Sequence, residues 1–562
     1  MRSVAMMTVL TAAGVAAVVM AADTPGQKLL GSGIIPAERL ADWRVGVTVG
    51  VPGGIPTDRK KLIDVTKEPY KADNTGATDA SAAIQQAMKD AKEKEVVYLP
   101  AGTYRINSGL GLKSHVTLRG AGMDKTVLML YNAASVAANG NYGTLHSAGG
   151  DVITGGLEKG STKITLASTA AYSVGQEIEI GAKNPTTVPM KPSDPVVVGV
   201  GGFDYLRQQK GIVTAKTDTT LTFQPPLYID YTKTPCRLLA ATPLVGVGVE
   251  DLAIDAVNST TPFVLKFSDN YGSWVKNVKV GNARNYTITM DDCIQCEIRH
   301  SWLDKQNRGS GSNGAGFLCE FSTGILFEDN IIGTSYPSIE VNFGTIGSVF
   351  AYNFLKNDDP TTQGIDMNHG PHNQLNLYEG NIIPNSMSDG YFGSNSSETI
   401  FRNWYRGVSG DQPTYTLALK RFSRNFSIVG NIFQDPNYKF SGKGLSLGQP
   451  NIGNSSDNGS TAPPWPDWGK KPGPGGFQEM DGGVLKTAII KDNFWYFDKT
   501  IDRPLPAGQR LPDSMYHRTK PAWFGDLKWP PFDPARPNPS FEAIPAGYRY
   551  VHNGKGPLTR QD

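Results

Sequence analysis

Acidic, amide and imidazole side chains gather in residues 366–381, which read DMNHGPHNQLNLYEGN. The stretch begins at Asp366 and places His369 and His372 close together, with Glu379 near its end. Side chains of these types bind a metal ion, exchange protons with a bound substrate, or simply form a polar turn that carries histidines. A zinc site made of both histidines and Asp366 is the weaker interpretation, because catalytic zinc prefers histidine ligands on a rigid secondary-structure element.

Similar polar segments lie on either side of this stretch. Glu340 and Asn342 stand in SIEVNFG, Asp366 and Asn368 in IDMNHG, and Asp389 and Tyr391 in MSDGYFG. The acids come 13 to 15 residues before an asparagine that recurs in the next apolar run. If each segment is one turn of a repeating fold, these carboxylates lie at nearly the same height on neighbouring turns.

The recurring asparagine is the main signal for such a repeat. From residue 270 onward it appears in short apolar runs as Asn277, Asn330, Asn353, Asn381, Asn403, Asn431 and Asn493, and Ser301 takes its place in CEIRHSW. Successive positions differ by 22 to 29 residues, except for a last step of 62. A repeat of this length, made of β-branched and aromatic runs, indicates stacked β units. We therefore predict a parallel β-helix with asparagine at a fixed corner, where it would adopt the left-handed turn conformation and bond to the coils above and below.

Residues 70–122 support this fold by resemblance. They contain a loop at 72–79 (ADNTGATD), an expected helix at 80–93 and the strand VYLPAGTY at 97–104. This order resembles the opening of the pectate-lyase-like right-handed parallel β-helix superfamily. The resemblance implies an all-β solenoid whose first coil is capped by the helix. It does not fix the reaction, because that superfamily includes hydrolases, lyases, epimerases and phage depolymerases.

The chain divides into six segments by pattern. Residues 1–22 read as a signal peptide, 23–60 as an extended segment and 61–150 as the start of the β-helix with its capping helix. Residues 151–240 alternate without the asparagine frame and predict a small antiparallel β insertion. Residues 241–500 would form the coils that carry the site, and the proline-rich residues 501–562 an extended tail that lies along the solenoid and covers its C-terminal end.

Stacked coils would bring the acids into reacting distance. Carboxylates on adjacent coils would lie about 5 Å apart and those two coils apart about 9–10 Å. The first spacing suits a retaining glycosidase pair and the second is near the inverting range. We assign Asp366 as the acid and Glu340 and Asp389 as candidate bases, with His369 bonding a carboxylate or a sugar hydroxyl. The expected substrate-binding residues are Asn342, Asn368, Tyr391, Phe392, Lys420 and Arg421.

Three functions fit this pattern. The first is a secreted glycoside hydrolase that cleaves a polysaccharide without a cofactor. The second is a polysaccharide lyase on a uronate-containing polymer, in which Glu340, Asp366 and Asp389 would hold Ca²⁺ and Lys420, Arg421 or His369 would abstract the proton. The third is a non-catalytic protein that binds glycans at a surface.

Bulk composition narrows the partners. The chain has 562 residues with 63 glycines and 38 prolines, which favours a β solenoid over a helical protein. A net charge of +2 gives no indication of nucleic acid or an acidic membrane as partner. We expect a monomer that is exported, secreted or periplasmic, and free of the membrane once the signal peptide is cleaved. CIQC at Cys293 and Cys296 lacks the second half of a zinc site, so buried thiols or one disulfide are expected for the four cysteines.

Overall fold

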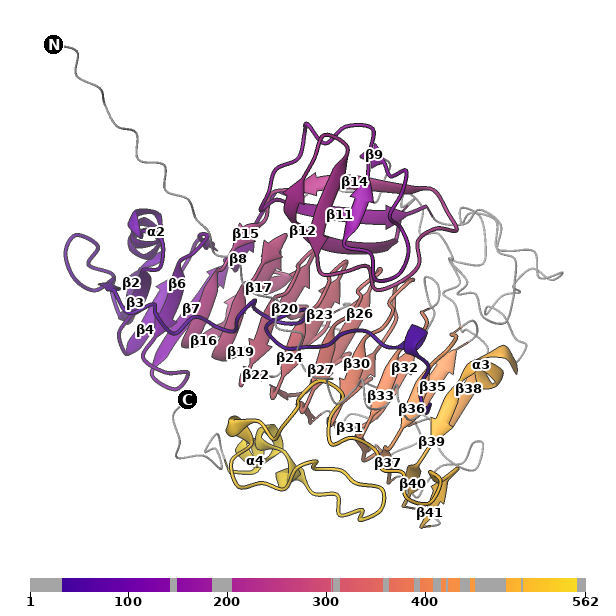
Figure 1. Cartoon of the computed structure of the whole chain (residues 1–562). Coiled ribbons are helices and arrows are strands. Elements are labelled where there is room, and N and C mark those ends of the chain that lie inside the picture. Colours follow the sequence, from indigo (N-terminus) through magenta and orange to yellow (C-terminus); the bar gives the residue numbers. More distant parts are fainter. Residues whose placement is uncertain are drawn as a thin grey trace, which may run out of the picture.

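The protein is seen here in a computed structural model. It describes residues 33–141, 149–183, 205–304, 306, 314–356, 363–388, 395–407, 416–420, 423–434, 445–449, 482–496 and 499–552. Most of these residues wind into a stack of coils, with an antiparallel sheet mounted on one side (Figure 1). The all-β parallel β-helix predicted from the sequence is thereby confirmed.

Each coil contributes strands to three parallel rows. In one middle coil these are β24 (Leu326–Glu328), β25 (Ile331–Ile332) and β26 (Ile339–Asn342). The first row continues through β21 (Glu297–Arg299), β27 (Val349–Ala351), β30 (Leu377–Glu379), β33 (Thr399–Phe401), β36 (Ser427–Val429) and β39 (Ile489–Lys491). The second runs through β22 (Trp302–Leu303), β28 (Phe354–Leu355), β31 (Ile382–Ile383), β34 (Trp404–Tyr405), β37 (Ile432–Phe433) and β40 (Asn493–Trp495), which pairs with the antiparallel β41 (Thr500–Asp502).

The third row forms a separate ten-stranded sheet. Its strands are β5 (Leu110–Gly111), β8 (Val136–Asn139), β17 (Phe263–Ser268), β20 (Tyr286–Asp291), β23 (Phe317–Glu320), β26, β29 (Ile365–Asp366), β32 (Ser386–Ser388), β35 (Leu417–Lys420) and β38 (Leu445–Gln449). β38 is followed in the described chain by the short helix α3 (Gly482–Thr487). This sheet carries four of the predicted site residues, namely Glu340, Asn342, Asp366 and Lys420.

The first coils are longer and are capped by a helix. They consist of β1 (Leu62–Asp64), β2 (Thr75–Asp79), β3 (Val96–Leu99), β4 (Gly102–Ile106), β6 (Thr117–Gly120) and β7 (Thr126–Asn132), followed by the long strands β16 (Gly248–Ser259) and β19 (Trp274–Gly281). Helix α2 (Ser81–Asp90) buries Ile84, Ala87 and Met88 against this end. The helix thus covers the apolar end of the stack, as the resemblance implied, but ends at Asp90 because Ala91 turns to an extended conformation.

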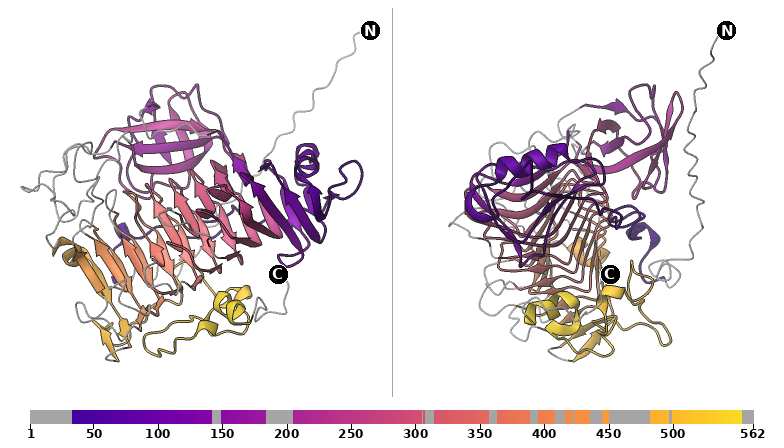
Figure 2. Two further views of the ribbon diagram at one scale, coloured as in Figure 1. Left: turned by 180° about the vertical axis from the view of Figure 1, so that it is seen from behind. Right: turned by 90° about the vertical axis from the view of Figure 1, so that its left-hand side faces the viewer.

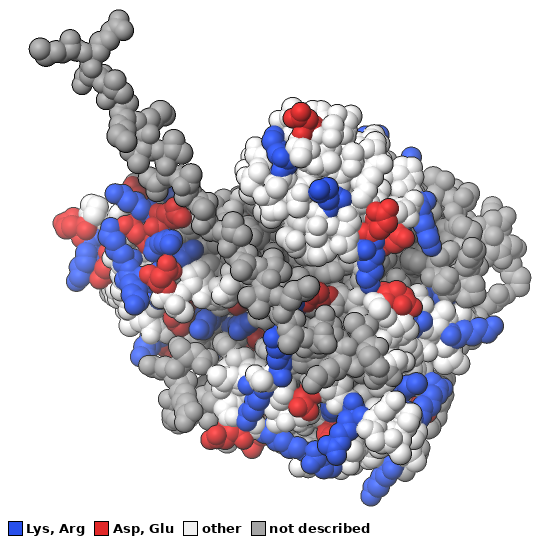
Figure 3. Space-filling model, viewed as in Figure 1, with Lys and Arg blue, Asp and Glu red and all other residues white. Residues whose placement is uncertain are grey.

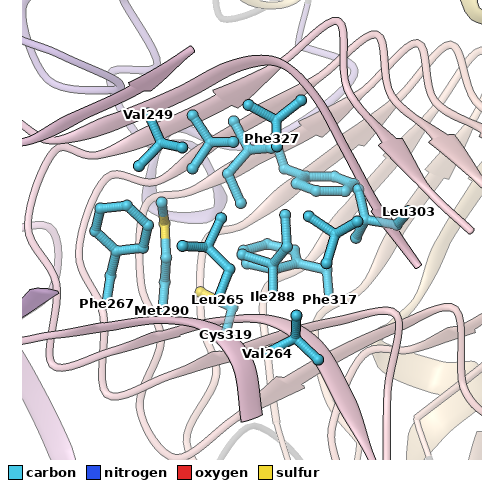
Figure 4. Packing of buried hydrophobic residues seen from close by; sticks show 14 of the residues in the cluster. Val249, Val264, Leu265, Phe267, Ile288, Met290, Leu303, Phe317, Cys319 and Phe327 are labelled. Atoms are coloured by element: carbon cyan, nitrogen blue, oxygen red, sulfur yellow. The ribbon is translucent and has the colours of Figure 1, made fainter. Parts of the chain in front are cut away.

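Buried apolar side chains fill the interior of the coils. Residues from the ten-stranded sheet, such as Phe267, Ile288 and Phe317, face Val249 and Phe327 of the other rows (Figure 4). Inward and outward side chains alternate along each strand, since successive residues of a strand point to opposite faces. In β23 and β26 the inward residues are therefore Phe317, Cys319, Ile339 and Val341, which leaves the residues between them to face outward.

An asparagine ladder holds successive coils together between the first and second rows. It consists of Asn330, Asn353, Asn381, Asn403, Asn431 and Asn493, all fully buried. From Asn353 onward, each Oδ1 accepts a hydrogen bond from the backbone N–H of the previous member, at 2.9–3.0 Å, and from its Nδ2, at 2.9–3.2 Å. Since unpaired buried amides are costly, the ladder fixes the register of the coils.

The left-handed conformation lies one residue before the ladder and not at the asparagine, so that part of the sequence prediction was wrong. Asp329, Tyr352 and Arg402 have φ of 54°, 54° and 50°. Asn277 occupies this earlier position, with φ of 54°, and Val278 donates its N–H to Ser301 Oγ in the ladder row. The ladder asparagines themselves do not have a positive φ.

The β insertion, residues 151–241, is a six-stranded antiparallel sheet in the order β10-β13-β12-β11-β14-β9. The strands are β9 (Asp151–Val152), β10 (Lys163–Thr165), β11 (Glu177–Ala182), β12 (Arg207–Lys216), β13 (Thr220–Gln224) and β14 (Cys236–Ala241). It has its own apolar core and rejoins the coils at β15 (Leu244–Val245), which pairs with β18 (Asn270–Tyr271). Figures 1 and 2 show it beside the coils that contain β17, β20 and β23. Few charged residues appear on its visible face (Figure 3).

Both terminal segments lie along the outside of the first two rows. The N-terminal segment, with the short helix η1 (Ala37–Arg39), donates the Trp43 Nε1–H to Leu375 O and the Val51 N–H to Glu297 Oε2. The C-terminal tail contains η3 (Ala522–Phe524), η4 (Phe541–Ala543) and α4 (Pro545–Val551). None of the described helices is long and apolar enough to cross a membrane.

The sequence analysis expected a tail that lies along the solenoid and covers its C-terminal end, and the described part of the tail does lie along the coils. It turns back along the second row, where Arg549 Nη1 reaches Asp329 Oδ2 at 2.5 Å (Figure 2). The outward residues of this row are large and apolar, among them Ile331, Phe354 and Ile382. Burying them against the tail provides the driving force for this path.

Candidate functional site

The candidate site lies on the outer face of the ten-stranded sheet, over strands β20, β23, β26 and β29. Because the strands pair in parallel register, outward residues of neighbouring strands form two lines of side chains across the sheet. One line contains Leu318, Glu340 and Asp366, each the direct partner of the next. The other line contains the partners Glu320 and Asn342. Glu340 and Asp366 therefore occupy vertically adjacent coils, about 4.8 Å apart along the stack.

Asn342 connects two of the carboxylates. Its Nδ2 donates to Glu320 Oε1 at 3.0 Å and to Glu340 Oε1 at 2.8 Å. The two N–H bonds of an amide diverge by about 120°, so acceptors at these distances lie about 5 Å apart. Glu320 and Glu340 thus form a close carboxyl pair bridged by one amide.

Backbone groups fix the orientation of this amide. Asn342 Oδ1 accepts the N–H groups of His369 and Gly370, at 3.0 and 3.1 Å. A Cβ on Gly370 would lie 2.5 Å from the Phe343 ring, so only glycine lets the segment after β29 approach this closely. With Oδ1 engaged by two donors, the NH₂ group of Asn342 must face the carboxylates.

Asp366 stands beside the pair and is supported from its own segment. Its Oδ1 accepts the Asn368 N–H at 3.0 Å, and its Oδ2 lies 3.9 Å from His369 Nδ1. Asp366 is 2% exposed, whereas the His369 side chain is 34% exposed and reaches toward solvent. Asp366 is thus held by its own segment, while the His369 side chain stands between it and solvent.

Burial is the main electrostatic influence on Glu320. Burial raises the pKa of the Glu320 carboxyl to about 7, and the negative charges of Glu340 and Asp292 add to this, while the Asn342 hydrogen bond and His369 oppose it. Burial also raises the pKa of the Tyr286 hydroxyl, at the start of β20, and the negative charges of Glu340 and Glu320 raise it further. The site therefore holds a carboxyl group that is partly protonated near neutral pH beside one that can be ionised.

The structure brings some of the predicted residues together and leaves others elsewhere. Glu340, Asn342, Asp366, Asn368 and His369 form one cluster with Glu320. Lys420 ends β35, which is two strands beyond β29 in the same sheet. Asp389, Tyr391, Phe392 and Arg421 lie outside the described residues.

The sequence analysis did not assign a role to Glu320. The spacing to the recurring asparagine did not reveal it, because Glu320 is not in the same line of side chains as Glu340. The partner of Glu340 is Leu318, and Glu320 lies two residues further along β23. The pattern FLCEF, with outward Leu318 and Glu320 alternating with core residues, is the signal that could have placed it on this face.

A metal site is not indicated among the described residues, where no three acidic, histidine or cysteine side chains converge as ligands. His372 is 3% exposed, and burial lowers its pKa to about 3, so it is neutral. The four cysteines are buried thiols without a disulfide, and Cys293 and Cys296 lie in the coil interior. CIQC is therefore a core segment.

Comparison with known proteins agrees with the fold. Residues 64–170 match the family described as rhamnogalacturonase A/epimerase, pectate lyase-like. The predicted resemblance to pectate-lyase-like β-helices is thus confirmed. Among curated proteins, none matches the chain.

Several solved structures have a similar arrangement. The tailspike protein gp49 of Pseudomonas phage LKA1 is 16% identical, with a TM-score of 0.47, over 68% of this chain and 63% of the tailspike. The A-module of the Azotobacter vinelandii mannuronan C-5 epimerase AlgE4 is 16% identical over 68% of this chain and 91% of its own, with a TM-score of 0.35. The GH87 α-1,3-glucanase of Streptomyces thermodiastaticus is 14% identical over 70% and 56%, with a TM-score of 0.33. This chain spans less than two thirds of the tailspike and of the glucanase, and at these identities the likeness concerns the fold and not the chemistry.

Proposed function

We propose that the protein is a carbohydrate-active enzyme, a glycoside hydrolase that cleaves a polysaccharide with the carboxyl groups on its ten-stranded sheet. The observation that carries the proposal is the pair formed by Glu320 and Glu340 on the single amide of Asn342. A spacing of about 5 Å is that of the two carboxyl groups in retaining glycosidases.

The environment of each carboxyl group suggests its role. Glu320, with its pKa raised to about 7, is the proton donor to the glycosidic oxygen. Glu340 is the ionised partner, because two carboxyl groups this close resist carrying two charges at once. Asp366 and the more exposed His369 flank the pair and would contact the sugar that is being cleaved. This assignment moves the acid from Asp366, the first choice from sequence, to Glu320.

The remaining parts of the hypothesis also stand as proposals. We infer that the polysaccharide is the partner, that no cofactor is needed, and that the chain acts as an exported monomer after cleavage of residues 1–22. The lyase alternative would require Ca²⁺ on Glu340, Asp366 and Asp389, of which Asp389 lies outside the described residues.

The test is a panel of polysaccharides incubated with the purified protein, with and without chelator. Reducing ends report hydrolysis, and the ultraviolet absorbance of an unsaturated product reports a lyase. We expect reducing ends without an unsaturated product, no effect of chelator, and a rate that falls as pH rises through about 7, because Glu320 then loses its proton.

Matched variants locate the activity. Glu320→Gln and Glu340→Gln should each lower the rate by about 10²-fold or more, whereas Glu93→Gln, an exposed carboxylate near the capping helix, should have no effect. Hydrolysis that is undiminished in Glu320→Gln would exclude the assigned acid. Glycan binding without any product would favour the non-catalytic alternative.

A further inference from the structure

Strand β12 of the β insertion lies directly against the coil corners next to the candidate site. The Lys210 backbone N–H donates to Thr323 Oγ1 at 2.9 Å, and Thr323 is three residues after Glu320. Just before the strand, Leu206 O lies so close to Gly344 that a Cβ on that glycine would clash with it. The insertion is therefore seated beside the ends of β23 and β26, where Glu320 and Asn342 stand.

The Lys210 side chain is buried among carboxylates at this contact. Its Nζ lies 2.9 Å from Asp292 Oδ1, 3.6 Å from Glu177 Oε1 and 3.7 Å from Glu179 Oε2. Lys210 and these three acids are at most 2% exposed, and the buried Asp269 adds another carboxyl group. Burial lowers the pKa of Lys210, but these acids raise it more, so the ammonium group keeps its proton.

Asp292 belongs to the coil immediately before Glu320. It follows β20, whose last residue, Asp291, pairs with Glu320, and its backbone N–H donates to Glu320 O at 3.2 Å. The Asp292 charge acts on the Glu320 carboxyl. One ion pair thus links the insertion to the neighbour of the proposed acid.

We propose that Lys210 is a positioning residue of the candidate site, which acts on Glu320 through Asp292 by keeping Asp292 ionised. The proposal rests on the function proposed above. In this arrangement the negative Asp292 favours the protonated form of Glu320, which is the form that a proton donor needs.

The direction in which the pKa of Glu320 shifts distinguishes an action of Lys210 through Asp292 from a direct action of Lys210 on Glu320. Without Lys210, Asp292 would stand buried beside Glu177, Glu179 and Asp269 without the charge of the Lys210 ammonium, which favours uptake of a proton by Asp292. Its repulsion of Glu320 would then disappear and the pKa of Glu320 would fall. If Lys210 instead acted directly on Glu320, loss of its positive charge would raise that pKa.

Other charged groups around these residues are the same in every variant of the test. Among the described residues, the groups that act on Glu320 include Glu340, Asp292, His369 and the Tyr286 hydroxyl, and those that act on Lys210 include Asp292, Glu177, Glu179 and Asp269. Asp292 belongs to both sets, so a change at Lys210 can reach Glu320 through it.

The experiment measures the protonation of Glu320 directly. Infrared difference spectra are recorded against pH, and the carboxyl band that is lost in Glu320→Gln identifies Glu320. We expect Lys210→Met and Asp292→Asn each to lower its titration midpoint by about one pH unit, the lower end of what a nearby like charge produces. Lys210→Arg, which keeps the charge, should leave it unchanged.

The double variant Lys210→Met/Asp292→Asn should shift the midpoint no further than Asp292→Asn alone, because both act on one path. A higher or unchanged midpoint in Lys210→Met, once circular dichroism shows that it folds, would overturn the proposal. An unchanged midpoint in Asp292→Asn would overturn it even if Lys210→Met does not fold. The spectra need no substrate, so failure of the polysaccharide assay would reject the proposed function and leave this link to be judged separately.

Discussion

Asn342 uses every hydrogen-bonding group of its side chain within the candidate site. Its oxygen accepts two backbone N–H groups and its NH₂ group donates to Glu320 and Glu340. The residue is 3% exposed, so water is a poor substitute for these partners. At the scale of single residues, the spacing of the acid pair therefore depends on an amide that is itself neither acid nor base.

Asn342→Asp tests this dependence with almost no change in shape. The new carboxylate would face two others in place of a donor, so its pKa and theirs would rise. Groups whose pKa is raised in the folded state stabilise it below their unfolded pKa, and that stability is lost as pH rises. We expect the variant to unfold more easily than wild type at pH 8, by about 1–3 kcal/mol, and by much less at pH 4.

Urea unfolding at the two pH values, followed by circular dichroism, provides the measurement. Asn258→Asp, which adds a carboxylate at an exposed position of β16, is the matched control and should show little change at either pH. An equal loss of stability at pH 4 and pH 8 in Asn342→Asp would contradict an electrostatic role for the amide.

At the scale of elements, the parallel register accounts for what could be predicted from sequence. The asparagine spacing placed β26 and β29 on neighbouring coils, and Glu340 and Asp366 are indeed direct partners. The asparagine spacing could not place Glu320, because its position on the outer face depends on which residues of β23 point inward. It also could not reveal Lys210 and Asp292, which approach each other only because the β insertion folds back on the coils.

The corner asparagines illustrate the same limit. Their recurrence revealed the repeat, but the turn conformation belongs to the residue before each one, which varies among Asp329, Tyr352, Gly380 and Arg402. A position occupied by such different side chains leaves no motif. The left-handed residue is required only to adopt a backbone conformation, whereas the asparagine after it is required for its side-chain hydrogen bonds. Only the asparagine is therefore recognisable as a repeat in the sequence.

Substitution of an asparagine in the middle of the ladder should therefore lower the free energy of unfolding. Asn381 donates to Phe350 O and Asn403 Oδ1 and accepts the Asn353 N–H, all without solvent. Asn381→Ala would leave buried backbone groups unpaired and should lower the free energy of unfolding by about 2–4 kcal/mol, since several groups lose their partners. Asn258→Ala, on the surface of β16, should change it by about 0.5 kcal/mol or less.

Chemical denaturation of both variants checks this prediction. A loss in Asn381→Ala no larger than in Asn258→Ala would mean that the ladder contributes little to the stability of the coils. Asn381 lies between the first and second rows and not on the ten-stranded sheet, so the folded variant should keep the pair of Glu320 and Glu340 intact.

At the scale of the whole molecule, the C-terminal tail ties several coils together from outside. Tyr516 Oη donates to Glu328 Oε1 at 2.6 Å, His517 Nε2 lies 2.7 Å from the same oxygen, and the Met515 N–H donates to Glu379 Oε2. Glu328 and Glu379 lie two coils apart in the first row. The tail thus links coils that are not adjacent, on the side of the molecule away from the candidate site.

Glu328 is the charged residue of the coils that both Tyr516 and His517 of the tail contact. Burial alone would raise its pKa, but Arg299, His517 and Tyr516 outweigh it and lower the pKa to about 2. A depressed pKa contributes stability above the unfolded value that is lost as pH falls toward the folded one. We expect the tail to detach as pH falls from about 4.5 toward 2, and Glu328→Gln to weaken its attachment at neutral pH.

Limited proteolysis followed by mass spectrometry detects detachment, because a tail that leaves the coils becomes a substrate for protease. In Glu328→Gln the residues after about 510 should be cleaved at least ten times faster than in wild type, since loss of a hydrogen-bonded buried charge partner costs well over 1.4 kcal/mol. Glu542→Gln, which removes an exposed carboxylate from the tail itself, is the control and should be cleaved at the wild-type rate. Equal cleavage of Glu328→Gln and wild type would show that the apolar contacts of the second row, among them those of Phe354 and Ile382, hold the tail without this charge.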